Sequence, residues 1–182
     1  MTLTAARPTP TRSHAGRVPR ALRRCVPSSP REAARRSVYA LIALPLGLLS
    51  IGLVLTGRSS RAARLRLTAA RRFLDSGPAD ATAGAGPGAL RVLGHSLPDA
   101  ALGIPTLILA GYAYGNTLRN LTYPIWYGDT DYHHAWGGPT LAGVWAVHAI
   151  GGLAFLALCL CLIKALTDVQ AGLARRTFAS PA

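Results

Sequence analysis

The sequence predicts an all-α integral membrane protein: one transmembrane helical hairpin, a first membrane segment that spans or is re-entrant, and basic juxtamembrane helices. Half of the chain is apolar and only 15% is charged, although 20 Lys and Arg accompany 7 Asp and Glu. The stretches 37–57, 100–118 and 132–163 contain no Asp, Glu, Lys or Arg. Because about 20 mostly apolar residues cross a bilayer, each stretch is long enough for a membrane segment. We therefore expect membrane segments at 37–57, 99–118 and 139–163.

Residues 1–36 contain nine arginines and several prolines, without apolar periodicity. This composition is typical of a disordered segment, and we expect a basic cytoplasmic tail. Two alternatives remain: a secretory signal peptide ending after 37–57, and a translation start downstream of Met1. No small-residue cleavage site follows the apolar run, which disfavours the signal peptide. The single lysine, Lys164, among many arginines and alanines indicates a GC-rich bacterial genome, so the expected location is the bacterial plasma membrane.

Residues 58–74 predict a basic amphipathic helix. Leu67, Ala70 and Leu74 recur at helical spacing, and most of the arginines lie off that stripe. Such a helix lies on the inner membrane surface, where anionic lipid attracts basic side chains. An ordinary solvated helix is the alternative. The Gly/Ala/Pro-rich residues 76–89 predict a flexible linker. The lipid-surface candidates are Arg61, Arg64, Arg71 and Arg72.

Counting basic residues favours a topology in which the first segment does not cross the membrane. With three simple spans, ten basic residues fall on each side, so the positive-inside rule gives no orientation. If 37–57 enters and leaves on one side, nineteen lie inside and one, Arg119, lies outside. Pro45, Gly47 and Gly52 would allow the bend. We therefore expect both termini to be cytoplasmic, with a plain span as the alternative.

Composition also argues against several function classes. The charge of +13 suggests nucleic-acid binding, but the arginine clusters lack interleaved aromatic side chains and any recognisable motif. Cys25, Cys159 and Cys161 show no metal-ligand spacing. No nucleophile–base pair or phosphate-binding loop is visible. We therefore predict no catalytic residues, no metal, no cofactor and no enzyme activity.

The expected outer loop, 119–138, lies within a cluster of eight of the chain's twelve aromatic side chains, between 112 and 145. Tyr and Trp favour the membrane–water interface, so an interfacial anchor is the simplest interpretation. The loop also contains carboxylates and imidazoles, which bind metals or sense protons. An ionisable side chain inside the next helix, His148, is a functional candidate by position. The candidate ligand-sensing residues are Asp129, Asp131, His133, His134, Trp136 and His148, with solvated loop residues as the alternative.

Small residues recur every four positions at the start of the last membrane segment. Such rows let helices approach closely in lipid, within the chain or between copies. The segment then continues as a cytoplasmic helix, 164–178. The candidate helix-packing residues are Gly138, Ala142, Gly143, Ala146 and Gly151.

Four segments together resemble a known family: RRSVYALIALPLGLL, the basic ARRFL, YPIWYGDTDYHHAWGGPTLAGVWAVHAIGG and LTDVQAGLARRTF. They are similar to the actinobacterial sensor domain, the membrane input region of histidine kinases, which also occurs as stand-alone proteins. The resemblance covers about residues 34–180, and we assign residues 37–180 to such a domain. It implies two helical hairpins, each followed by a basic helix, and no defined ligand. The first unit departs from this pattern because it lacks a second membrane helix.

We therefore expect a membrane-embedded signal-input module without catalytic output of its own. Its partners would be membrane lipid, a histidine kinase of a two-component system or another membrane protein, and a second copy of the chain. The alternative is a structural or accessory subunit of a larger membrane complex.

Overall fold

The computed structural model describes residues 25–76 and 88–178, and every regular element in them is helical. The helices are α2 (Pro30–Leu55), α3 (Ser59–Leu74), α4 (Ala89–Leu121), α5 (Tyr123–Tyr127) and α6 (Leu141–Phe178). Three of them, α2, α4 and α6, are long and apolar enough to cross a membrane. The all-α prediction with three membrane-length helices is therefore confirmed at this level.

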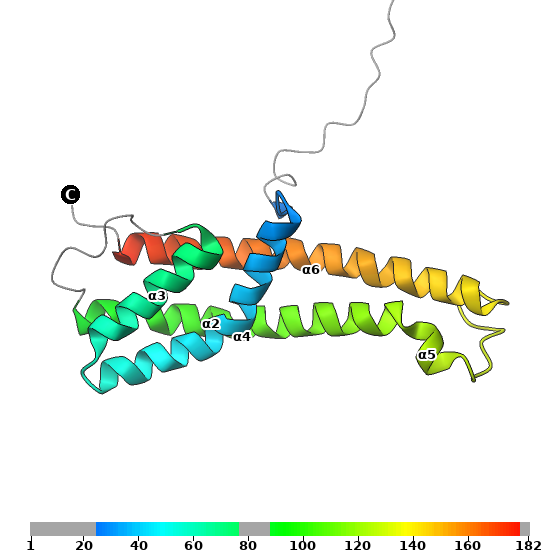
Figure 1. The fold of residues 1–182 in the computed structure, drawn as a ribbon, viewed down its shortest axis with the longest axis horizontal. Coiled ribbons are helices and arrows are strands. Elements are labelled where there is room, and N and C mark those ends of the chain that lie inside the picture. Colours follow the sequence, from blue (N-terminus) through cyan, green and yellow to red (C-terminus); the bar gives the residue numbers. More distant parts are fainter. Residues whose placement is uncertain (1–24, 77–87, 179–182) are drawn as a thin grey trace, which may run out of the picture.

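The long helices α4 and α6 lie side by side along the length of the molecule (Figure 1). Thr117 Oγ1 donates a hydrogen bond to the Gly152 carbonyl at 3.1 Å, and Trp145 Nε1 donates one to the Leu121 carbonyl at 2.9 Å. Because one index rises while the other falls along these contacts, the two helices are antiparallel. The predicted hairpin of 99–118 and 139–163 lies within this pair.

Helix α2 begins within the predicted tail. Pro30 occupies the first turn, where a backbone N–H would have no partner within the helix. The Ser29 hydroxyl caps the helix by accepting a hydrogen bond from the Glu32 backbone N–H at 3.1 Å. Arg36 then pairs with Glu32 and with Asp168 of α6, each at 2.8 Å. The prediction of disorder was therefore wrong for residues 30–36, because capping and ion pairs stabilise a helix there. Residues 1–24 of the predicted tail lie outside the described residues.

Helix α2 bends part-way along its length (Figure 1). Pro45 lies inside it and lacks the N–H that would bond to the preceding turn, which permits a kink. At the bend, α2 packs against α4 so closely that a Cβ atom on Gly103 would lie 2.6 Å from the Leu44 amide nitrogen. A Cβ on Gly47 would likewise lie 2.6 Å from the Ala100 Cβ. Glycine is therefore required for this contact between α2 and α4.

A tight turn reverses the chain between α2 and α3. Gly57 has a φ of 75°, a conformation that glycine adopts without strain, and the Arg58 amide donates to the Leu53 carbonyl at 2.7 Å. Helix α3 then runs back along α2, and Arg35 near the start of α2 pairs with Asp75, just past the end of α3, at 2.5 Å. The predicted 58–74 helix is confirmed. Its apolar stripe, however, is buried in the protein by α2, α4 and α6.

Two further boundaries differ from the sequence predictions. Helix α4 begins at Ala89, ten residues before the predicted membrane segment, because Val92, His95 and Ser96 are buried among the other helices. The predicted loop 119–138 contains the short helix α5, which starts with Pro124 in its first turn. Most of the predicted linker 76–89 lies outside the described residues.

Candidate functional site

The loop between α5 and α6 presents its predicted ligand-sensing residues to solvent. The Asp131 carboxylate accepts the backbone N–H of His133 at 3.1 Å and lies 3.0 Å from His133 Nδ1. These bonds, the backbone one first, hold the pKa of the Asp131 carboxyl below its ordinary value. The pair is exposed, with 63% of the His133 side chain and 75% of the Asp131 side chain accessible. The loop thus forms a local turn rather than an enclosed site.

The other loop candidates do not converge on this pair. Asp129 and His134 are exposed, and Trp136 is 85% exposed. Within residues 25–76 and 88–178, no three His, Cys, Asp or Glu side chains are grouped so that they could hold a metal ion. The loop residues therefore present separate polar and aromatic groups at one end of the molecule (Figure 1).

His148 has a different environment, because it lines a small pocket between α4, α5 and α6. Its ring stacks on Tyr123 with the centroids 4.1 Å apart, and Tyr123 stacks on Tyr127 at 4.5 Å. Its Nδ1 lies 2.8 Å from the Val144 carbonyl, which orients the ring. The Tyr127 hydroxyl accepts a hydrogen bond from Arg119 Nη2 at 2.6 Å. Three stacked rings and a guanidinium therefore form one wall of the pocket.

This outer pocket, lined by Asn116, Arg119, Asn120, Tyr123, Tyr127 and His148, encloses about 230 Å³. Arg119 supplies a permanent positive charge, the two amides supply donors and acceptors, and the aromatic faces supply stacking surface. Such a set suits a small polar or anionic molecule. Of the lining residues, our sequence interpretation singled out His148 alone. Residues 116, 119, 120, 123 and 127 recur at three- to four-residue spacing, a helical periodicity that could have identified this face.

Within the described part of the chain, the predicted small-residue rows do not pack against another helix. Ala142, Ala146 and Gly151 are exposed on α6, and a Cβ added to Gly151 would meet nothing within 4 Å. Gly138 and Gly143 approach the backbone of the preceding loop instead. The α4 contact uses Gly152, whose added Cβ would lie 2.8 Å from the Asn120 Cβ. Among residues 25–76 and 88–178, no helix covers this exposed row, which leaves it accessible to another molecule or to lipid.

A second cluster of polar side chains lies buried at the opposite end of the molecule, where α2, α3, α4 and α6 meet. Arg66 Nη2 of α3 lies 2.5 Å from Asp99 Oδ2 of α4, with side-chain exposures of 1% and 0%. The Tyr39 hydroxyl of α2 lies 3.3 Å from both carboxylate oxygens. Gln170 Nε2 of α6 donates to the Asp99 carbonyl at 3.3 Å. Each of the four helices therefore contributes a polar side chain to this inner cluster.

The inner cluster contains polar atoms that form no hydrogen bond within residues 25–76 and 88–178. These atoms include Arg66 Nε and Nη1, His95 Nδ1, Ser96 Oγ and Gln170 Oε1. An unpaired buried polar group costs about 1–3 kcal/mol of folding free energy. The inner cluster therefore stabilises the fold less than an apolar core of the same volume would. His95 also contacts Phe178 of α6 edge-on, with the ring centroids 4.9 Å apart. A small shift of α6 would thus change the partners of several groups at once.

The predicted lipid-surface arginines lie along α3. Arg61, Arg64 and Arg72 are exposed, whereas Arg71 is partly buried. Arg66, which our sequence interpretation omitted from this set, is buried in the inner cluster. Its position directly before Leu67 and one turn before Ala70 places it on the buried face, which the helical period could have indicated.

Helix α6 joins the outer pocket to the inner cluster without interruption. It has 38 residues and is therefore about 57 Å long, well beyond the ~30 Å hydrocarbon core of a bilayer. His148 lies near its first end, and Gln170 and Phe178 lie near the other. A displacement of this helix at one end therefore reaches the other end through a rigid element.

We compared the chain with models of protein families, with curated proteins and with solved structures, and found no match in any of the three. The resemblance to the sensor domain family therefore stays an expectation based on the quoted segments.

Proposed function

We propose that this chain is a membrane signal-input module that binds a small polar molecule at its outer end and relays the event to a partner protein at its inner end. The observation that carries the proposal is the continuity of α6 between the outer pocket and the inner cluster. Both ends hold polar groups whose contacts depend on the position of α6. The partner we expect is a histidine kinase, as in the family that the sequence resembles.

In this proposal, α4 and α6 cross the membrane as a hairpin, while α2 and α3 remain on the inner side. Arg36 near the start of α2 contacts Asp168 of α6, and Val54 near its end clusters with Ala174 and Phe178. Helix α2 thus extends from the inner end of the charge-free stretch, where Ala40 packs against Ile163, to the charged end of α6. Helix α3, with five arginines and no acidic residue, lies alongside α2 and is a poor candidate for the hydrocarbon core.

The test uses the full chain in the membranes of its own host. A photo-crosslinking amino acid is placed at Val169, which is 53% exposed on the inner part of α6, and the captured protein is identified by mass spectrometry. Capture of a histidine kinase supports the proposal. The kinase is then assayed for phosphorylation with the wild-type chain and with His148→Ala, across candidate stimuli.

We expect His148→Ala to reduce the response severalfold, because it removes one ring of the stacked wall. A double variant, His133→Ala with His134→Ala, separates the pocket from the exposed loop. If both variants respond as the wild type does, the outer end takes no part in signalling and the proposal fails.

The alternative, an accessory subunit, is favoured by the exposed row on α6 that includes Ala142 and Ala146. It predicts a stable complex that Ala146→Leu disrupts, because close packing needs small side chains. The control is Gly111→Leu, which adds at least as much side-chain volume on an open face of α4. Loss of the complex with the first variant only, together with a signalling activity unaffected by His148→Ala, would favour this alternative.

A further inference from the structure

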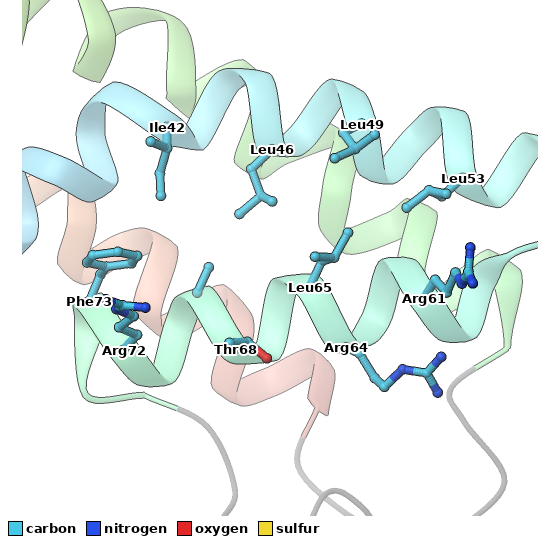
Figure 2. A pocket seen from close by; sticks show the side chains of 11 residues that line it. Ile42, Leu46, Leu49, Leu53, Arg61, Arg64, Leu65, Thr68, Arg72 and Phe73 are labelled. Carbon is cyan, nitrogen blue, oxygen red and sulfur yellow. The ribbon is translucent and has the colours of Figure 1, made fainter.

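An apolar groove runs between the second half of α2 and α3, apart from both the outer pocket and the inner cluster. Figure 2 shows Leu46, Leu49 and Leu53 of α2 pointing toward α3, and Leu65 and Phe73 of α3 forming the opposite wall. The groove holds about 680 Å³, within the range of about 300–1,000 Å³ that is typical of small-molecule sites.

The groove has the length of one acyl chain. Its α2 wall extends from Ile42 to Leu53, which is about 16 Å at the helical rise of ~1.5 Å per residue. One leaflet contributes about half of a ~30 Å hydrocarbon core, so a lipid tail in a bilayer extends over a similar distance. Leu49 remains 53% exposed, which indicates that protein covers this wall only in part.

Positive charge borders the groove at both ends. Arg61 lies near Leu53, Arg72 lies beside Phe73, and Arg64 projects from the same helix (Figure 2). All three are exposed, and no Asp or Glu is among the residues that line the groove. Guanidinium groups bind phosphate through paired N–H donors, which makes arginine well suited to an anionic head group. Aliphatic walls with a cationic border complement an anionic amphiphile.

In the topology proposed above, on which this step rests, the groove lies next to the inner leaflet. At one end of the groove, Arg35 Nε donates a hydrogen bond to the Arg72 carbonyl. The neighbouring Arg36 pairs with Asp168, which lies on α6 just past the charge-free stretch of that helix. Lipids of that leaflet are therefore the most concentrated amphiphiles available to it. A docked helix of another protein would instead require acidic side chains to match the border.

We propose that the groove between α2 and α3 binds one acyl chain of an anionic phospholipid, whose phosphate is held by Arg61 and Arg64 at one end while Arg72 adds positive charge at the other. This goes beyond the signal-input function, because it assigns a ligand to a surface that the relay through α6 does not use. The acyl chain of the bound lipid would fill the groove, cover its apolar walls and hold α3 against α2.

The test reconstitutes the full chain in nanodiscs of phosphatidylcholine that contain a small fraction of a phosphatidylglycerol with a photoactivatable tail. A phosphatidylcholine with the same tail is the matched probe. After irradiation, the labelled peptides are quantified by mass spectrometry. We expect the anionic probe to label the 42–53 segment at least tenfold more than the neutral probe, since each of the arginines that border the groove contributes about 1 kcal/mol to anionic lipid binding.

Two variants localise the effect. The triple variant Arg61→Gln, Arg64→Gln and Arg72→Gln should lower anionic labelling to the level of the neutral probe. The control Arg31→Gln, Arg58→Gln and Arg176→Gln removes equal charge from exposed arginines outside the groove and should leave labelling unchanged. Leu49→Trp, which fills the groove without changing charge, should reduce labelling severalfold.

Several results would overturn the proposal. Equal labelling by both probes, equal loss in the triple variant and its charge-matched control, or labelling confined to α4 and α6 would each exclude a specific lipid site. Disulfide crosslinking of Leu49→Cys between two copies in the same nanodisc would show that a second chain covers the groove. Circular dichroism and gel filtration of every variant verify that reduced labelling reflects binding rather than misfolding.

Discussion

Arg66 of α3 and Asp99 of α4 form an ion pair at 2.5 Å in which neither side chain is exposed by more than 1%. The two residues are 33 positions apart in the chain, and Tyr39 of α2 and Gln170 of α6 complete the cluster around them. Burying two charges is expensive, and mutual attraction with additional hydrogen bonds offsets that cost only when the geometry is good. The inner cluster therefore adds little net stability, and its main effect is to fix the arrangement in which the four helices meet.

Replacing Asp99 with Asn should destabilise the protein strongly. The substitution leaves the Arg66 guanidinium buried without a counter-charge, a situation that costs about 3–5 kcal/mol. Arg64→Gln, on the exposed face of the same helix α3, should change stability by less than about 0.5 kcal/mol. Unfolding in detergent, followed by circular dichroism, measures both.

A double variant with Arg66→Met and Asp99→Leu should recover most of the loss, because no isolated charge remains. Equal stability of Asp99→Asn and Arg64→Gln would show that the pair is not buried as described.

The contact between α2 and α4 should be sensitive to a single methyl group. In Gly103→Ala the new Cβ would lie 2.6 Å from the Leu44 nitrogen and 2.8 Å from its Cα, and backbone atoms cannot move aside cheaply. We expect a loss of about 1–3 kcal/mol, as for other overpacked sites. Gly111→Ala is the matched control on the same helix, because nothing lies within 4 Å of its added Cβ.

Alanine has the higher helix propensity, so the control should be neutral or slightly stabilised. Thermal denaturation of the two variants in one detergent compares them directly, and similar midpoints would argue against a close approach at Gly103.

The Asp131 carboxyl should titrate at a pH that depends on His133. Hydrogen bonds from His133, above all from its backbone N–H, lower the pKa of Asp131. His133→Ala removes the imidazole and keeps the amide, whereas His133→Pro removes both donors. The pKa of Asp131 should therefore rise in the order wild type, His133→Ala, His133→Pro, as measured by carbon NMR of the labelled side chain.

The same shift sets the pH range in which the carboxylate stabilises this turn. Because the folded pKa is lowered, the contribution is present above the ordinary pKa of aspartate and is lost as the pH falls through the lowered value. The wild-type turn should thus loosen at a lower pH than the turns of the two variants. A turn that loosens at the same pH in all three proteins would show that these hydrogen bonds do not form in solution.

The apolar pattern of the chain was sufficient to predict its three long helices, because lipid-length stretches without charge have few alternatives, but it did not predict where α2 and α4 begin or that α5 forms. The sequence also located the basic helix 58–74 and identified His148 as an unusual side chain. It did not reveal that Arg66 belongs to the interior, since composition alone assigns arginine to the surface. The residues that line the pocket with His148 were missed because Arg119 and Tyr127 were assigned to a loop, although the spacing of residues 116–127 is helical. Likewise, the glycines that matter for packing, Gly47 and Gly103, depend on which helices meet.

The sidedness of the α2–α3 pair tests the account most directly. Single cysteines at Arg58, Asp131 and Arg176, in a chain whose three native cysteines are replaced, are exposed to a membrane-impermeant maleimide in intact cells and again after permeabilisation. The account predicts that Asp131→Cys reacts in intact cells, whereas Arg58→Cys and Arg176→Cys react only after permeabilisation. Labelling of Arg58→Cys in intact cells, with Arg176→Cys still protected, would mean that α2 crosses the membrane and would contradict it.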